Sequence, residues 1–181
     1  MRKLLNEELD RLEIEAFKDS VKLPVVVVLD NIRSLNNIGS VFRTSDGFRL
    51  ESIMLCGITA TPPHKDIHKT ALGATESVDW SYQKHTLDAI HVLKEDGYTV
   101  VSVEQVEGAV MLESFRVDPA AKYALVFGHE MRGVQQEVVD VSDMCLEIPQ
   151  YGTKHSLNIS VAAGVVIWEV FKQMASRLMG E

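Results

Sequence analysis

The sequence predicts an α/β fold in which helices flank a mainly parallel β-sheet. Segments with strand-like patterns alternate along the chain with segments that have helical apolar spacing. The run Val25–Leu29 is apolar without alternation, which is typical of a strand buried on both faces of a parallel sheet. The length, 181 residues, is sufficient for a single domain with at most a small appendage.

The first half of the chain is expected to contain two strands. Leucines at helical spacing predict an amphipathic N-terminal helix, the main part of a helical extension over residues 1–21. Glycine at position 47 ends the next predicted helix, and a proline pair interrupts the segment that follows the second strand. The predicted elements are a helix over 3–19, a strand over 25–29, a loop over 30–37, a helix over 38–48, a strand over 52–56, and a long connection over 57–74 with one helical turn near 64–72.

The second half repeats the alternation and completes one domain over residues 22–181. Gly97 and Pro149 mark the ends of a helix and of a strand, and small residues occupy the start of the last helix. The predicted elements are a helix over 86–95, strands over 98–103 and 123–127, a helix over 134–139, a strand over 144–148 and a long helix over 156–179.

The charge is acidic overall but unevenly distributed. The chain has 26 acidic and 18 basic residues and a formal net charge of −8, which argues against a nucleic-acid binder that uses its whole surface. Residues 76–118 carry nine acidic and three basic residues, whereas residues 31–70 carry five basic and three acidic ones. The basic stretch could hold a polyanion locally, or it could be an ordinary solvated surface.

Several classes of protein are not expected. The longest apolar runs are shorter than a membrane span, and the N-terminus turns acidic before any apolar core, unlike a signal peptide. We therefore expect a cytoplasmic protein in which Cys56 and Cys145 are reduced and buried. His64 and His68 have the spacing of metal ligands, but the segment has no glutamate in the second position, so exposed polar residues are favoured over a metal site.

Ligands of parallel sheets bind beyond the carboxyl ends of the strands. The loops of interest therefore follow Leu29, Val103, Phe127 and Ile148. In the first of them, Asn37 precedes a predicted helix. Gly39 lies in the first turn of that helix, and Arg43 lies further along it. A glycine permits close backbone approach, a helix N-terminus can bind an anion, and an arginine suits phosphate. A capped helix with a surface arginine is the alternative.

The second loop contains the pattern Gly-x-Glu-x-x-Gly after a buried strand. Gly128 and Gly133 flank Glu130. Two glycines beside a carboxylate at a strand end suggest a ligand loop. A polar turn, in which the glycines serve only backbone geometry, is an equally acceptable interpretation.

The third loop connects a strand to the last helix through a polar glycine turn. It contains Gln150, Gly152 and Lys154, and Ser156 and Asn158 open the helix. Ser156 is a plausible N-cap. Asn158 is a mediocre helix former, so a position in the first turn suggests that its amide faces a ligand.

Together the three loops resemble the SpoU/TrmH family of the SPOUT superfamily. The residues that carry the resemblance are Asn37-x-Gly39-x-x-x-Arg43, Phe127-Gly-x-Glu130-x-x-Gly133 and the long block Ile148-Pro-Gln-x-Gly152-x-x-x-Ser156-Leu-Asn158-Ile-Ser-Val-Ala162. It covers about residues 22–178. The sequence departs from the family pattern at His129, where asparagine is frequent, and at Gln150, where methionine is frequent.

The resemblance implies methyl transfer from S-adenosylmethionine to a ribose 2′-hydroxyl of tRNA or rRNA. Because the sequence shows no separate RNA-binding domain, a compact substrate such as tRNA is slightly preferred. It also implies a C-terminal trefoil knot and a homodimer. The short apolar runs and the weak histidine pattern predict no membrane and no metal. The residues that it places in catalysis are Asn37, Arg43, Glu130, Ser156 and Asn158. Those that it places at the cofactor are Val103, Phe127, Gly128, Ile148, Gln150, Gly152 and Leu157, and the strand end at Val103 and Glu104 is expected to close that pocket.

An arginine is almost always protonated, so we interpret Arg43 as a phosphate clamp that also stabilises the developing oxyanion. The candidates for a basic RNA groove are Arg33, Arg43, Arg49, Lys65, Lys69, Arg132 and Lys154. The candidates for the dimer interface, with core packing as the alternative, are Val161, Val165, Trp168, Val170 and Phe171. Two other functions remain open: methylation of an RNA base, and RNA binding without catalysis.

Overall fold

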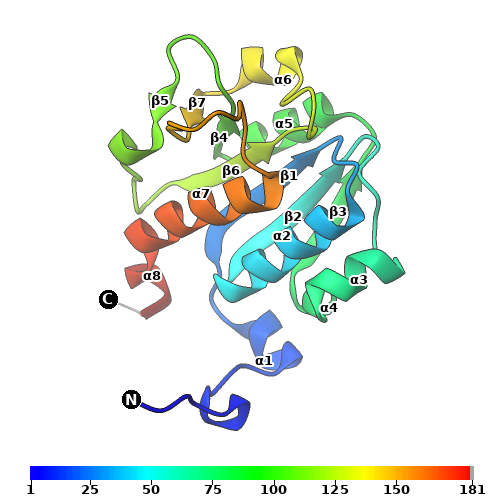
Figure 1. Cartoon of the computed structure of the whole chain (residues 1–181), viewed down its shortest axis with the longest axis vertical. Coiled ribbons are helices and arrows are strands. Elements are labelled where there is room, and N and C mark those ends of the chain that lie inside the picture. The colour runs from blue at the N-terminus through cyan, green and yellow to red at the C-terminus, as the bar shows by residue number, and fades with distance from the viewer. Residues whose placement is uncertain (180–181) are drawn as a thin grey trace.

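The sheet predicted from the sequence is present and wholly parallel. In the computed structural model, which describes residues 1–179, seven strands form one sheet in the order β3-β2-β1-β6-β4-β7-β5 (Figure 1). Every neighbouring pair in it is parallel. The strands are β1 (Leu23–Asp30), β2 (Leu50–Cys56), β3 (Asp79–Gln83), β4 (Tyr98–Val103), β5 (Val110–Met111), β6 (Lys122–Phe127) and β7 (Met144–Glu147).

Helices cover both faces of this sheet. The helices are α1 (Ile14–Asp19), α2 (Leu35–Gly47), α3 (Lys65–Ala71), α4 (Ala74–Ser77), α5 (Thr86–Glu95), α6 (Gln136–Val141), α7 (Ile159–Met174) and α8 (Ser176–Met179), with short 3₁₀ turns at Asn6–Glu8 and Leu112–Ser114. Helices α2, α3, α4 and α7 lie on one face, and α5 and α6 lie on the other (Figure 1). No helix in the described range is both long and apolar enough to span a membrane.

Strand β1 joins the two hydrophobic cores. Val25, Val27 and Leu29 pack with α2 and α7, whereas Val26 and Val28 pack with α5 and α6. Successive side chains of a strand point to opposite faces, so an unbroken apolar run is needed where both faces are buried. This confirms the interpretation of the run Val25–Leu29.

The end of β1 is fixed by a buried carboxylate. Asp30 is fully buried. Its carboxylate accepts hydrogen bonds from the Thr86 hydroxyl (2.6 Å), the Asn31 amide (2.8 Å) and both the backbone and side-chain N–H groups of Gln135 (3.0 and 2.8 Å). Thr86 begins α5 and Gln135 caps α6. Asp30 therefore ties two helix N-termini to the carboxyl edge of the sheet, where an anion is electrostatically favoured.

Several sequence predictions need correction. The single helix over residues 3–19 is wrong, because α1 begins only at Ile14 and a 3₁₀ turn is the one other helical piece before it. Exposed leucines in this segment have no core to pack on, and short helices depend on such packing. The last helix begins at Ile159, not at residue 156, and ends at Met174, with Ala175 between it and the short helix α8.

Two strands were missed. In β3, four of the five residues are exposed, and β5 has only two residues, both exposed. Neither segment has the buried apolar pattern on which strand prediction depends. The cysteines are unpaired as predicted, although only Cys56 is fully enclosed and Cys145 is half-buried. Burial and the negative charge of nearby Asp30 raise the pKa of the Cys56 thiol to about 12, against a smaller lowering effect of Thr86.

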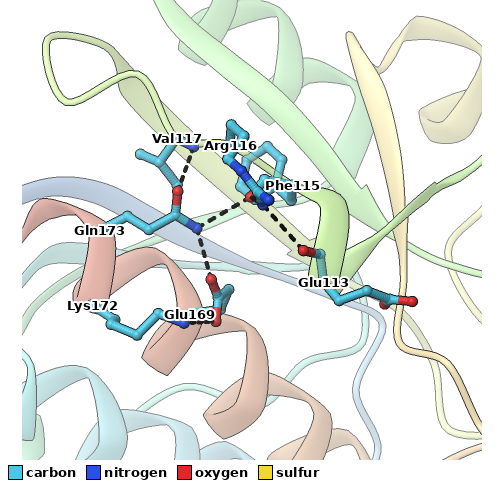
Figure 2. Close-up of polar contacts among 7 residues, drawn as sticks. All are labelled: Glu113, Phe115, Arg116, Val117, Glu169, Lys172 and Gln173. Carbon is cyan, nitrogen blue, oxygen red and sulfur yellow. Dashed lines mark hydrogen bonds and ion pairs between the residues drawn. The ribbon is translucent and has the colours of Figure 1, made fainter.

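A side-chain clamp holds the irregular segment after β5 against α7 (Figure 2). The Gln173 amide accepts a hydrogen bond from the Val117 N–H (2.9 Å) and donates to the Phe115 carbonyl (3.2 Å) and to Glu169 (2.8 Å). Phe115 and Val117 are buried beneath it. One glutamine thus gives the Val117 N–H its partner and adds to the bond that the Phe115 carbonyl accepts from Arg116.

We expect Gln173→Ala to lower the free energy of unfolding by about 2 kcal/mol, because the Val117 N–H loses its partner and the Phe115 carbonyl keeps only its bond from Arg116. Lys172→Ala is the matched control, since Lys172 lies next to Gln173 and makes an exposed ion pair with Glu169. Its loss should cost less than about 1 kcal/mol. Urea unfolding of both variants measures the difference, and equal losses would contradict the clamp.

Candidate functional site

A cavity of about 550 Å³ lies at the carboxyl ends of β4, β6 and β7. Among the residues that line it are six of the seven expected at the cofactor: Val103, Phe127, Gly128, Ile148, Gln150 and Leu157. Gly152 is not in the lining and belongs to the exposed segment 151–158. Of the residues expected in catalysis, Glu130, Ser156 and Asn158 line the cavity.

The floor of the cavity is a tight loop over residues 128–133. His129 and Gly133 exchange backbone hydrogen bonds of 3.0 and 2.8 Å. A Cβ atom on Gly128 would lie 2.1 Å from the Gly133 carbonyl carbon and from the Val134 nitrogen. Gly133 has a φ of +67°, and a Cβ there would meet the Glu104 carboxylate. Both glycines are therefore required by the backbone, because a side chain at either position would collide with the loop itself or with Glu104.

His129 has a structural role in this loop. Its Nδ1 accepts a hydrogen bond of 3.0 Å from the Met131 N–H. The side-chain oxygen of an asparagine can accept a bond from the N–H two residues on in the same way. The histidine in place of the frequent asparagine is thus compatible with the same loop geometry.

Glu104 closes one side of the cavity, as expected for the end of β4. Its carboxylate accepts hydrogen bonds from the Val134 N–H (2.8 Å) and the Gln105 N–H (2.9 Å). It lines the cavity and also lies in the acidic region 76–118. The acidic region therefore reaches the site at this residue, although the sequence distribution suggests that it lies apart from the three loops.

Glu130 joins the second loop to the first. Its carboxylate accepts hydrogen bonds from the N–H groups of Arg33 (3.1 Å) and Ser34 (2.9 Å) and from the Asn37 amide (3.2 Å). Ser34 is the N-cap of α2 and accepts from the Asn37 N–H. The N–H groups of Ser34 and Asn37 at the start of α2 are thus bonded by the protein's own side chains, and the negative charge at this helix N-terminus is supplied by Glu130.

Asn37 and Asn158 join the first loop to the third. The Asn158 amide donates to the Asn37 side-chain oxygen (3.2 Å), and its own oxygen accepts from the Ser160 N–H (2.9 Å). Asn158, not Ser156, is therefore the N-cap of α7. Ser156 lies outside the helix, exposed, in the cavity lining. The chain Glu130–Asn37–Asn158 brings together one residue from each of the three predicted motifs.

The hydrogen bonds to Glu130 favour its charged form. Partial burial acts to raise the pKa of this carboxyl, but the bonds from Arg33, Ser34 and Asn37 outweigh burial and hold the pKa below its ordinary value of 4.5. A carboxylate with a lowered folded-state pKa stabilises the fold above the unfolded-state pKa, and this contribution disappears as the pH falls through the folded-state pKa.

We expect Glu130→Gln to reduce the free energy of unfolding at pH 7 by about 1 kcal/mol, since Glu130 is half-exposed and solvent screens its bonds. The difference from wild type should shrink as the pH falls below about 4.5 and the wild-type carboxylate becomes protonated. Chemical unfolding at a series of pH values measures this change. A difference that does not depend on pH would contradict the role assigned to the charge.

Gly39 is buried on α2, whereas Arg43, about one turn further along the same helix, is exposed. A Cβ atom on Gly39 would lie 2.1 Å from the Thr70 hydroxyl and 2.3 Å from the Ile67 carbonyl oxygen. The glycine therefore permits close packing of α3 on α2, and it does not serve the approach of a ligand as the sequence suggested. Arg43 is exposed, does not line the cavity, and forms no ion pair within the described part of the chain.

The seven basic candidates do not form one group. Arg132 lines the cavity, and Arg33 lies beside it through the bond of its N–H to Glu130. Lys65 and Lys69 are exposed on α3, next to α2. Arg49 lies at the opposite edge of the sheet, where its carbonyl accepts from Leu23 at the start of β1. We therefore omit Arg49 from the candidate RNA surface.

Sequence reasoning missed several residues of the site. Ser34 caps α2, and His155 and Met131 line the cavity. A serine three positions before Asn37 is a recognisable helix-start signal and would have placed the helix correctly. Met131 and His155 carry no pattern of their own and are placed only by the loops that hold them.

Comparison with known proteins gives concordant results. A sequence model described as the SpoU rRNA Methylase family matches residues 24–168. A Staphylococcus haemolyticus protein assigned to the TrmH family of tRNA/rRNA methyltransferases is 30% identical over 160 residues, which cover 88% of this chain and 63% of that protein. The chain thus spans less than two thirds of this relative's length.

Solved structures show the same fold. The A. aeolicus TrmH/SpoU tRNA modifying enzyme superposes with a TM-score of 0.79 at 25% identity, over 92% of this chain and 82% of that one. A second solved structure comes from work on the 2-OH methylation of C/U34 on tRNA. It superposes with a TM-score of 0.73 at 26% identity, over 84% of this chain and 97% of that one.

Proposed function

Since the chain belongs to the SpoU rRNA methylase family, we propose that it transfers a methyl group from S-adenosylmethionine to a ribose 2′-hydroxyl of RNA. The observation that carries the proposal is the bonded chain Glu130–Asn37–Asn158 beside the cavity, which unites the three motifs of the family. Residues far apart in the sequence meet there at the edge of the sheet where ligands of parallel sheets bind.

The residues of the cavity fit the proposed cofactor. Its volume of about 550 Å³ lies within the usual range for small-molecule sites. Gly128 has no side chain, so the loop over residues 128–133 can close tightly beside the cavity. Val103, Ile148 and Leu157 supply apolar walls, and main-chain N–H and C=O groups between them can bond an adenine edge. When bound, S-adenosylmethionine supplies an electrophilic methyl group.

The protein's own residues then have to hold the RNA and assist loss of the hydroxyl proton. Arg43, exposed on α2, is suited to clamp a phosphate next to the reacting ribose and to stabilise negative charge on its oxygen. Glu130 is held ionised but is occupied by three donors, so it positions α2 and its arginine. Ser156 and Asn158 orient the ribose and the cofactor in the proposed site.

We propose tRNA ahead of rRNA as the substrate. Two solved structures support this preference for tRNA: the A. aeolicus tRNA modifying enzyme, and the structure from work on 2-OH methylation of tRNA. Binding by a narrow basic surface on an acidic body is expected to be salt-sensitive.

We further propose a homodimer through α7 and a C-terminal trefoil knot. Val161, Val165 and Trp168 leave 52%, 38% and 51% of their surfaces exposed and share one face of α7. Val170 is buried in the core, so we no longer include it among the residues proposed for the dimer interface. Strand β7 lies between β4 and β5, both earlier in the chain, an arrangement that supports a threaded C-terminus.

Methyl transfer from labelled S-adenosylmethionine to total tRNA and to total rRNA, followed by mapping of the modified nucleotide, tests the proposal. We expect label on tRNA at a position that resists alkaline cleavage of the backbone, as 2′-O-methylation does. Label on a base would instead support base methylation. Absence of S-adenosylmethionine binding by calorimetry would support an RNA-binding module without catalysis.

A further inference from the structure

A second cavity, of about 450 Å³, lies between the start of α3, α4 and the edge strand β3. We refer to it as the β3 pocket, and the residues that matter in it are Pro63, His64, Lys65, His68, Glu76 and Trp80. We propose that the β3 pocket binds an unstacked nucleobase of the RNA substrate. This inference rests on the proposed function, because it names a second contact with the same RNA.

Trp80 is the central feature of the pocket. It stands on β3, which has β2 as its one partner in the sheet, and 36% of its surface is exposed. Pro63 and Ile67 line the same cavity, so the indole borders an apolar slot. Aromatic rings that are accessible beside an apolar slot are the usual platforms on which proteins stack single-stranded bases.

The polar groups around the slot suit the edge of a base better than a bare phosphate. His64 accepts a hydrogen bond from the Asp66 N–H on its Nδ1 (3.2 Å), so in the neutral ring Nε2 carries the proton and can donate. Glu76 can only accept when ionised. A carboxylate in the lining repels phosphate but accepts from the amino group of a base, while Lys65 can neutralise the phosphate that follows.

The position of the pocket is consistent with the proposed RNA surface. Helix α3 packs directly on α2, where the Thr70 hydroxyl donates to the Asn36 carbonyl (3.0 Å). Arg43 is exposed on α2, and Lys69 is exposed on α3. Exposed basic residues are therefore present on both of these packed helices, the second of which begins at the β3 pocket (Figure 1).

The pocket is distinct from the proposed cofactor cavity. The two share no lining residue in the described chain. Strands β2 and β1 separate β3 from β6 in the sheet, which amounts to about 14 Å at the usual strand spacing. The bound base therefore belongs to a nucleotide other than the one that is methylated, and it contributes to the choice of substrate.

Binding of total tRNA to Trp80 variants tests the proposal without requiring methyl transfer. We expect Trp80→Ala to weaken tRNA affinity about tenfold, and Trp80→Phe to restore most of it because the ring still stacks. Tyr82→Ala is the matched control, since Tyr82 is an exposed aromatic residue on the same strand that does not line the pocket. It should bind tRNA as the wild type does.

Fluorescence provides a second measurement that does not depend on removing Trp80. The chain has two tryptophans, so in Trp168→Phe the emission comes from Trp80 alone. Total tRNA and a short single-stranded oligoribonucleotide should both quench it. In a transfer assay, Trp80→Ala should raise KM about tenfold with kcat unchanged.

The outcomes separate this inference from the proposed function. Quenching together with weaker binding by Trp80→Ala supports the pocket even if no methyl group is transferred, in which case the proposed function fails. Methyl transfer by Trp80→Ala with an unchanged KM and no quenching would overturn the pocket and leave the proposed function intact. If Trp80→Ala does not fold, the quenching result and Trp80→Phe decide the question.

Discussion

Gly128→Ala should abolish binding of S-adenosylmethionine to the cavity. The added methyl group would lie 2.1 Å from two main-chain atoms of residues 133 and 134. These are backbone atoms that cannot rotate away, so the loop over residues 128–133 has to open. The opening breaks the paired hydrogen bonds between His129 and Gly133 and moves the wall of the cavity. Calorimetric titration with the cofactor measures the loss.

Gly152→Ala is the matched control for this prediction. A Cβ atom at Gly152 has no described heavy atom within 4 Å, and Gly152 does not line the cavity. We expect it to bind the cofactor with wild-type affinity. We also expect Gly128→Ala to lose about 2 kcal/mol of unfolding free energy, a typical cost of overpacking. Tight cofactor binding by a folded Gly128→Ala protein would show that the cofactor lies elsewhere.

Arg43→Ala should lower the rate of methyl transfer by about 10²–10³-fold, the usual cost of removing a group that stabilises developing negative charge. Arg43→Lys should recover part of the affinity for RNA but little of the rate, because an ammonium lacks the planar fork that bonds phosphate in two places. Rates under single-turnover conditions and RNA affinity, measured separately, distinguish the two contributions.

Arg49→Ala provides a control of equal charge. Arg49 lies at the amino ends of β1 and β2, at the edge of the sheet opposite the cavity. Its removal should leave both the rate and the affinity for RNA close to wild type. A near-normal transfer rate in Arg43→Ala would remove this arginine from the catalytic proposal, and a large loss in Arg49→Ala would return that residue to the RNA surface.

The sequence by itself determined the buried framework. The double-sided strand Val25–Leu29 was predicted because burial on both faces demands an unbroken apolar run. The loops after β4, β6 and β7 were predicted to carry the site because parallel strands end together at one edge. Each of these predictions depends on patterns within short segments of the chain, and such local patterns can be identified in a single sequence.

The tertiary structure decided which groups meet. Exposed β3 gives no apolar pattern, and β2 alone holds it in the sheet. The need for glycine at position 39 comes from the close packing of α3, which lies about thirty residues further along the chain. Glu130 bonds the start of α2 across more than ninety residues, and Asn158 caps α7 while it bonds Asn37. These contacts are chosen by packing between distant segments, so no local pattern in the sequence contains them.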